Sequence, residues 1–222
     1  MAETSVTSDE SVTVADGRAT RAERTRMAVV DALLALNEKG NLRPTAREIA
    51  AEAGVSLRSI YVHFDDVESL LVAAAVRHGE YLMSLARPVP TEGPIGHRVA
   101  ALVANRRALY EAGSGVRRAA LVQEPFSPAL QRALEAGRKA GRAEIDSVFA
   151  DELAAVGASG GQLRQALALT LGSTSWDVMR RYQKLTADEA EEQLRTMAVA
   201  LLEGWDGAVE AGSSGPSEPP ET

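Results

Sequence analysis

The sequence contains no cysteine among its 222 residues, which excludes disulfides, thiolate chemistry and cysteine-ligated zinc sites. Aromatic residues make up only 4% of the chain, and alternating β-branched residues are scarce. Alanine and leucine are abundant instead, so the composition favours an all-helical protein. No apolar run has the length of a membrane span or of a signal peptide, and we therefore expect a cytoplasmic protein.

Sequence signatures of catalysis are also missing. The three histidines, His63, His78 and His97, form no His-x-x-x-His pair, and no phosphate loop, dinucleotide fingerprint or Gly-x-Ser-x-Gly elbow occurs. Two carboxylates could still meet in a helical fold. The missing site chemistry nevertheless argues against an enzyme, and we expect neither a metal nor a cofactor.

The net charge of −7 is unevenly distributed along the chain. Residues 1–17 carry four acids and no Lys or Arg, residues 18–64 carry eight Lys or Arg against five acids, and residues 65–222 carry 16 against 22. Local charge governs attraction to phosphates, so the segment 18–64 can bind nucleic acid although the whole chain is acidic.

The segment 45–64 reads as two short helices joined by a Gly-Val-Ser turn. Thr45 is a good N-cap with Glu48 three residues later, which completes the capping-box pattern. Gly54 stands where a helix end favours left-handed backbone angles, and Ser56 can cap the second helix. This spacing is typical of a helix-turn-helix.

The second of these helices has two different faces. At about 100° per residue, Leu57, Ile60 and Phe64 fall on the inner side, with Tyr61 at the margin. The outer side carries a guanidinium, a hydroxyl, an apolar branch and an imidazole, from Arg58, Ser59, Val62 and His63. Such groups suit guanine acceptors, a thymine methyl and phosphate oxygens. A solvated helix face is the alternative, and an exposed Val62 fits it least well.

Residues 22–85 resemble the DNA-binding domain of the TetR family of bacterial transcriptional regulators. The match rests on a helix over 22–39, the string TAREIAAEAGVS, the I-Y-x-H-F pattern at 60–64 and the following DDVESLL segment. The resemblance implies an N-terminal DNA-binding domain and a C-terminal helical domain for ligand binding and dimerisation. It also implies a homodimer on a palindromic operator, which usually represses until a small ligand binds.

The resemblance assigns a role to each residue of the reading helices. By this resemblance, phosphates are contacted by Thr45, Tyr61 and His63. Bases are read by Arg58 and Ser59, and Arg47 stands where some members reach a base. Val62 stands where an apolar side chain can contact a thymine methyl. The predicted DNA-binding residues are Thr45, Arg47, Ser56, Arg58, Ser59, Tyr61, Val62 and His63. One departure is Val67, where many members carry a phosphate-binding lysine.

The composition of the chain and the positions of its glycines and prolines suggest four segments. We expect a disordered arm over 1–20, a helix-turn-helix domain over 21–66, a helical ligand-binding and dimerisation domain over 67–210, and a disordered tail over 211–222. Residues 67–86 form the linking helix, with Asp65 as its N-cap and Glu68 as the capping-box partner.

Beyond the proline-rich loop 87–94, the pattern predicts helices over 95–112, 115–123, 127–155, 160–183 and 187–209. The last two carry the predicted dimer residues Leu163, Leu167, Leu171, Met179, Leu194, Met197, Leu201, Leu202 and Trp205. Two such helices can pair with their two-fold mates as a four-helix bundle, and in the family the dimer forms there. An intrachain hairpin packed on the core would use most of the same residues.

A ligand pocket is implied by the family resemblance. The candidate residues are the large rings Tyr110, Phe126, Phe149 and Trp176, with Asn105, Gln123, Thr174 and Asp177 as polar partners. An apolar cleft with a few polar groups suits a small hydrophobic or amphipathic ligand. Each ring alone, however, is more often part of a core than of a pocket.

A second function keeps DNA binding without a small-molecule switch. Such a protein would be constitutive, controlled by another protein, or an activator. A dry and closed C-terminal core would favour this alternative, whereas a roomy cavity would favour the ligand switch.

Overall fold

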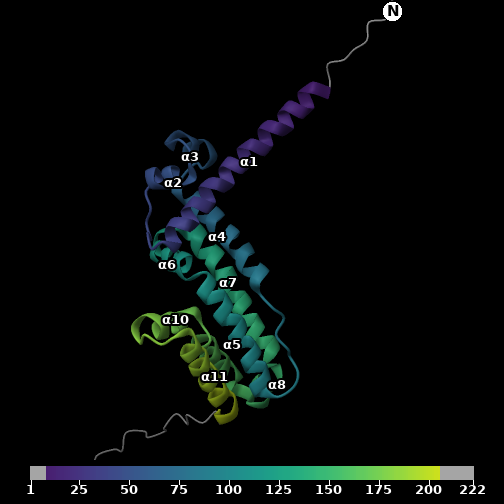
Figure 1. The fold of residues 1–222 in the computed structure, drawn as a ribbon. Helices are drawn as coiled ribbons and strands as arrows, with labels where there is room; N and C mark the ends of the chain where they lie inside the picture. The colour runs from purple at the N-terminus through teal and green to yellow at the C-terminus, as the bar shows by residue number, and fades with distance from the viewer. Residues whose placement is uncertain (1–8, 206–222) are drawn as a thin grey trace, which may run out of the picture. The chain divides into compact units, whose positions relative to one another are not determined.

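The computed structural model describes residues 9–205, with side chains from Ala19 onward. These residues form helices joined by short turns and contain no strand (Figure 1). The all-α prediction is confirmed. The predicted tail over 211–222 and the first eight residues of the predicted arm lie outside the described residues.

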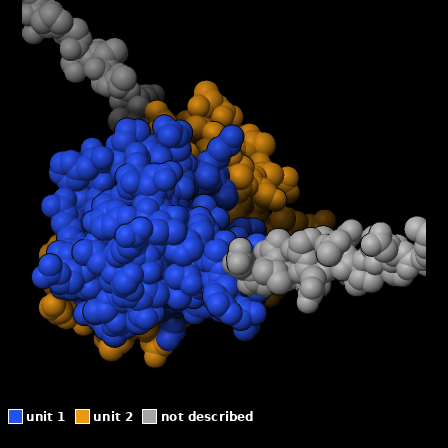
Figure 2. Space-filling model, turned by 90° about the horizontal axis from the view of Figure 1, so that it is seen from above, with its two compact units in different colours: residues 1–87, 107–140 blue, residues 88–106, 141–222 orange. Residues whose placement is uncertain are grey.

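The chain divides into two compact units, coloured separately in Figure 2. Residues 1–87 and 107–140 form the first unit, with α1 (Asp9–Glu38), α2 (Ala46–Ala53), α3 (Leu57–His63), α4 (Val67–Leu85) and α6 (Ser114–Gln123). Residues 88–106 and 141–222 form the second, with α8 (Ala150–Ala155), α9 (Gly160–Thr170), α10 (Ser173–Asp177) and α11 (Ala187–Gly204). The helices α5 (Ile95–Ala112) and α7 (Pro128–Val148) each contribute residues to both units.

Helix α1 begins at Asp9, inside the segment 1–20 that composition suggested to be disordered. Val29, Val30 and Leu33 anchor the helix in the core that it forms with α2, α3 and α4. Once a helix is nucleated, adding further residues at its end costs little, and residues 9–26 contain no proline. Composition alone therefore underestimated how far the helix extends toward the N-terminus.

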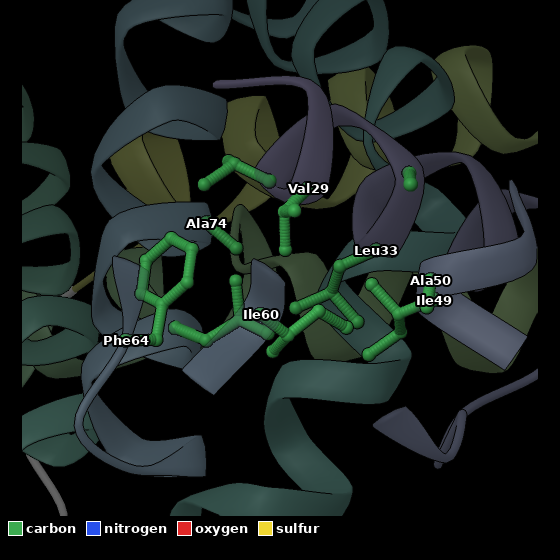
Figure 3. Packing of buried hydrophobic residues seen from close by; sticks show 10 residues of the cluster. Val29, Leu33, Ile49, Ala50, Ile60, Phe64 and Ala74 are labelled. Atoms are coloured by element: carbon green, nitrogen blue, oxygen red, sulfur yellow. The ribbon is translucent and has the colours of Figure 1, made fainter. Parts of the chain in front are cut away.

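The core of the helix-turn-helix region is apolar and consists of aliphatic side chains and one ring (Figure 3). Its members are at most 5% exposed: Val29, Val30, Ala32 and Leu33 of α1, Ile49 and Ala50 of α2, Ile60 of α3, Phe64, and Leu70 and Ala74 of α4. Leu57 was expected among them but is 38% exposed, because it stands in the first turn of α3, away from the centre of the core.

The N-cap of α4 is Asp66 and not the predicted Asp65. Asp66 has extended backbone angles, and its Oδ1 accepts a hydrogen bond from the Ser69 amide at 2.7 Å. Ser69 therefore completes the capping box that the sequence pattern assigned to Glu68. The Glu68 carboxylate instead accepts a hydrogen bond from the Ser127 hydroxyl, 59 residues away.

The second unit buries charged groups as well as apolar ones. Arg98 of α5 is 6% exposed, pairs with Glu152 of α8 and donates to the Val148 carbonyl at 2.6 Å. Its bonds to Glu152 lower the pKa of that carboxyl. Arg106 of the same helix pairs with Glu144 at 2.7 Å.

Two predicted long helices of the second unit are interrupted. The predicted helix 127–155 divides into α7 and α8 at Phe149, whose ring is fully buried. The predicted helix 160–183 divides into α9, α10 and a π-helical turn, Val178–Tyr182. Hydrophobic periodicity in the sequence did not reveal these breaks, because apolar residues on both sides of each break remain buried in the core.

Candidate DNA-reading surface

A capping box between Thr45 and Glu48 fixes the start of α2. The Thr45 amide donates to Glu48 Oε2 at 2.7 Å, and the Glu48 amide donates to Thr45 Oγ1 at 3.3 Å. The bonds from the Thr45 backbone and side chain lower the pKa of the Glu48 carboxyl. Thr45 and Arg47 are both exposed at this helix end, where amide groups and the helix dipole favour a phosphate.

The turn between the two short helices has the geometry that its sequence predicts. Gly54 adopts left-handed angles with φ +66°, which a residue with a side chain rarely adopts. Ser56 then caps α3, since its Oγ accepts from the Ser59 amide at 3.1 Å. The two hydroxyl oxygens of Ser56 and Ser59 are 2.8 Å apart and share a hydrogen bond.

Helix α3 buries one face and presents the other to solvent. Ile60 is buried, whereas Tyr61 is 62% exposed and Val62 is 69% exposed. Arg58 is exposed, and Ser59 and His63 are half-buried. Within the part of the chain that the structure describes, the side chains of Arg47, Arg58, Tyr61 and His63 have no hydrogen-bond or ion-pair partner. The outer face of α3 thus presents polar side chains that have no partner in the described residues, together with the exposed aliphatic side chain of Val62.

Two arginines beside this surface were not placed by the sequence pattern. The Arg26 guanidinium lies over the Phe64 ring, 5.3 Å from its centroid, beside the end of α3. The Arg43 guanidinium lies over the Phe126 ring at the same distance and donates to the Val122 carbonyl at 3.4 Å. No local signal identifies these contacts, because each partner lies more than 35 residues away along the chain.

Val67 occupies the first position of α4 and is 63% exposed. Val67 stands where the family resemblance leads us to expect a lysine, so an uncharged side chain occupies this accessible position. A phosphate contact through a cationic side chain is not available at this residue.

The predicted ligand residues are divided between the two units. Tyr110, Gln123 and Phe126 belong to the first unit, and the other five belong to the second. Phe126 is 76% exposed, whereas Phe149 and Trp176 are 0% and 1% exposed and form part of the core. Asn105 is buried and donates to Glu144 at 3.4 Å, Thr174 is exposed, and Asp177 is half-buried.

Open grooves do occur in the first unit. One of about 620 Å³ runs between α1 and α4, past Met27, Val72 and Val76. A second of about 510 Å³ lies between α1, α4 and α6, past Leu34 and His78. Burial lowers the pKa of the His78 imidazole; nearby Glu38 opposes this shift and Arg117 adds to it.

The predicted dimer residues fall into two groups. Six are less than 9% exposed within the single chain: Leu163, Leu167, Leu171, Met179, Leu194 and Leu202. These pack in the intrachain arrangement of α9 and α11, and a side chain already covered in one chain has no surface left for a partner. Met197, Leu201 and Trp205 are half-buried and follow each other at spacings of four along α11.

In residues 9–205 no helix is both long and apolar enough to cross a membrane. The same residues contain no group of three or more His, Cys, Asp or Glu side chains that could hold a metal ion.

Comparison with known proteins agrees with this geometry. Residues 30–74, which span the end of α1, the helices α2 and α3 and the start of α4, match the sequence model of the bacterial regulatory proteins of the tetR family. A search of curated proteins found no match. The crystal structure of a transcriptional regulator from Rhodococcus sp. Rha1 superposes with a TM-score of 0.63 at 22% identity, covering 82% of this chain and 96% of that one.

The structural likeness concerns the fold of the chain, and the family match covers the helices that carry the exposed reading face. Both agree with the capped α2, the left-handed turn at Gly54 and the exposed outer side of α3. Residues 30–74 therefore carry the helix-turn-helix DNA-binding domain of the tetR family of bacterial regulatory proteins, which identifies the chain as a DNA-binding transcriptional regulator.

Proposed function

We propose that this regulator is a homodimeric repressor that reads a palindromic operator through α3 and is released by a small molecule. The observation that carries the DNA-reading part is the outer face of α3, where Arg58, Tyr61 and Val62 are exposed and Arg58 and Tyr61 have no hydrogen-bond or ion-pair partner in the described residues. A guanidinium without a protein partner can make a bidentate contact to guanine, and an exposed valine can meet a thymine methyl.

The remaining residues of the surface suit the DNA backbone. Arg47 at the start of α2, and Tyr61 and His63 on α3, present donors to phosphate oxygens. The amide and the hydroxyl of Thr45 both donate to Glu48 Oε2, so the Thr45 hydroxyl would have to leave this carboxylate to donate to a phosphate. Ser59 has a hydroxyl engaged with Ser56, which orients it beside Arg58 at the base-reading positions. A helix-turn-helix dimer places its two reading helices about 34–36 Å apart in successive major grooves, so we expect half-sites at that spacing.

The second copy would contact the half-buried stripe Met197–Leu201–Trp205 of α11. This stripe lies beside the buried stripe Leu194–Ala198–Leu202, so one helix can pack inside its own chain and against a partner at the same time. Leu201→Glu should convert the protein to monomers in light scattering coupled to size exclusion. Glu203→Ala, on the exposed side of the same helix, is the control; dimers that persist in Leu201→Glu would refute this interface.

Release by a ligand has a specific rival, a DNA binder without a small-molecule switch. The rival is favoured by the full burial of Phe149 and Trp176, which makes these rings part of a closed core. The two can be separated by titrating the protein with the apolar dye ANS, with operator affinity measured in parallel. Saturable dye binding that lowers operator affinity supports the switch, and no effect of the dye or of other apolar compounds on operator affinity supports the rival.

The decisive experiment for DNA reading is a selection of bound sequences from a random DNA pool at near-physiological salt. We expect an enriched palindrome, and the Arg58→Ala protein should lose preference at one base pair per half-site, by about 1–3 kcal/mol. Tyr61→Phe should weaken all sequences alike. Arg195→Ala is the matched control; Arg195 is an exposed residue of α11 whose ion pair in the described part of the chain is with Glu192. An operator preference unchanged by Arg58→Ala would show that the reading face is misassigned.

A further inference from the structure

The end of α6 and the start of α7 form a corner that contacts the chain at two points, one on each side of the two helices α2 and α3. This α6–α7 corner comprises residues Val122–Leu130 and includes the 3-10 turn Glu124–Phe126. Along the chain, one contact point precedes the reading helices and the other follows them. Arg43 lies two residues before the N-cap of α2, and Glu68 lies four residues after the C-cap of α3.

The Glu68 contact is the stronger of the two. Glu68 Oε1 accepts from the Ser127 hydroxyl at 2.7 Å and from the Ala129 amide at 3.1 Å. Ser127 is 4% exposed, and its Oγ accepts in turn from the Leu130 amide at 3.1 Å. A carboxylate of α4 thus satisfies an amide in the first turn of α7, where the helix itself offers no partner. The hydroxyl bond and then the amide bond lower the pKa of Glu68, so the acceptor is charged at neutral pH.

The Arg43 contact is weaker and more exposed. Its guanidinium lies 5.3 Å from the centroid of the Phe126 ring and donates to the Val122 carbonyl at 3.4 Å. A cation–π contact at a solvent-exposed site is a weak attraction compared with a charge-assisted hydrogen bond. The Phe126 ring is 76% exposed, and Arg43 covers part of one of its faces.

We propose that the α6–α7 corner positions the DNA-reading helices, with Glu68 as the principal positioning residue and Arg43 as the secondary one. The inference rests on the proposed operator-reading function of α3. Helices α2 and α3 lie in the chain between these two contacts, and both contacts end on the same short corner. Fixing both flanks on one support restricts the orientation of α3 without any direct contact between the corner and DNA.

Replacing Glu68 should change operator affinity in opposite directions, depending on whether the residue acts by positioning the reading helices or only through its charge. Removing a negative charge from a DNA-binding unit should tighten binding to phosphates. Loss of a positioning contact should weaken binding to the operator instead. Glu68→Gln removes the charge but keeps an oxygen that can accept from Ser127 and Ala129, whereas Glu68→Ala removes both.

The experiment measures operator affinity by fluorescence anisotropy well below the unfolding midpoint of every variant, with the full-length protein. Glu68→Ala should weaken operator binding about tenfold, as expected for loss of a charge-assisted hydrogen bond, and Arg43→Ala by a smaller factor. Glu68→Gln should restore affinity to that of the wild type or better. Ser127→Ala should weaken binding as well, and combining it with Glu68→Ala should add little, because the two side chains act through one contact.

The matched control is Glu80→Ala, an exposed carboxylate of the same helix with no hydrogen-bond or ion-pair partner in the described residues. Its operator affinity should equal or slightly exceed that of the wild type. Operator affinity unchanged or tightened in Glu68→Ala would overturn the positioning role, as would equal losses in Glu68→Gln and Glu68→Ala. A wild-type protein that prefers no sequence would instead overturn the operator-reading function on which the inference rests.

Discussion

The helix-turn-helix region and the second unit hold their helices together by different polar contacts. Around the reading helices, short-range caps fix the helix ends, Thr45–Glu48, Ser56–Ser59 and Asp66–Ser69, over an apolar core. The longer-range polar contacts there, Lys39–Glu52 and Glu68–Ser127, are not part of that core. In the second unit, two buried arginines of α5 reach carboxylates far along the chain: Arg98 binds Glu152 and Arg106 binds Glu144.

This difference has consequences for how each region tolerates change. A missing cap costs about 1 kcal/mol, whereas a buried charge that loses its partner costs about 3–5 kcal/mol. The helix-turn-helix can therefore vary its outer face, where the bases are read, at little cost to its own stability. The second unit should be sensitive at single buried positions that never contact DNA.

The largest contrast should come from two phenylalanines. Phe149→Ala, in the core of the second unit, should lower the free energy of unfolding by about 3–5 kcal/mol, because it removes a fully buried ring. Phe126→Ala should cost less than about 1 kcal/mol, since that ring is mostly exposed and loses only its contact with Arg43. Equilibrium urea unfolding measures the free energy of unfolding of both variants. Equal losses in Phe149→Ala and Phe126→Ala would contradict the expected difference between the two rings.

Next in size is the buried ion pair. Arg98→Ala should destabilise the protein by about 3 kcal/mol, because Glu152 is left partly buried and unpaired. Arg195→Ala, which breaks an exposed pair with Glu192, should stay within about 0.5 kcal/mol. The double variant Arg98→Met with Glu152→Leu should recover most of the loss; a double variant as unstable as Arg98→Ala would show that the charges are not the cause.

A pair of glycines tests how closely the first unit is packed. A Cβ at Gly115 would lie 2.6 Å from the Glu38 Cα and 2.7 Å from the Asn37 carbonyl oxygen, both of them backbone atoms, so Gly115→Ala should destabilise by about 1–3 kcal/mol. Gly79, inside α4, has nothing within 4 Å of the added Cβ, and Gly79→Ala should stabilise by about 0.5–1 kcal/mol. Thermal unfolding followed by circular dichroism distinguishes the two signs.

The smallest effects should come from the two equivalent capping boxes. Thr45→Ala and Thr186→Ala should each cost about 1 kcal/mol, because both remove the same cap from a helix. Only Thr45→Ala should also weaken operator binding. If Thr186→Ala weakened DNA binding equally, the loss would reflect helix stability and not a phosphate contact.

The capping boxes also predict a pH dependence with a definite sign. The bonds from Thr45 and Thr186 lower the pKa of Glu48 and of Glu189 in the folded protein. Their stabilising contribution is therefore fully present above the ordinary glutamate pKa of about 4.3 and is lost as the pH falls through the lowered folded value. Unfolding midpoints measured across this acidic window should fall less steeply in Thr45→Ala and Thr186→Ala than in the wild type.

Much of the reading surface could be predicted because its causes are local. The left-handed turn at Gly54, the caps at Thr45 and Ser56 and the exposure of Val62 follow from residues within one or two helical turns. Even there, a choice between neighbouring caps needed the structure. Asp65 and Asp66 have the same side chain, and Asp66 is the cap because its backbone is extended at the correct place.

The amino-acid sequence by itself determined the all-helical fold, the helix-turn-helix and the identity of its outward-facing residues, because helical periodicity and capping depend on neighbours in the chain. Only the tertiary structure decided that Leu163 and Leu194 pack inside their own chain and that Phe149 divides a helix. It also decided that Glu68 accepts hydrogen bonds at the start of α7. In each of these cases the partner lies far along the chain, and the pattern that marks a side chain as buried or bonded does not say what covers it.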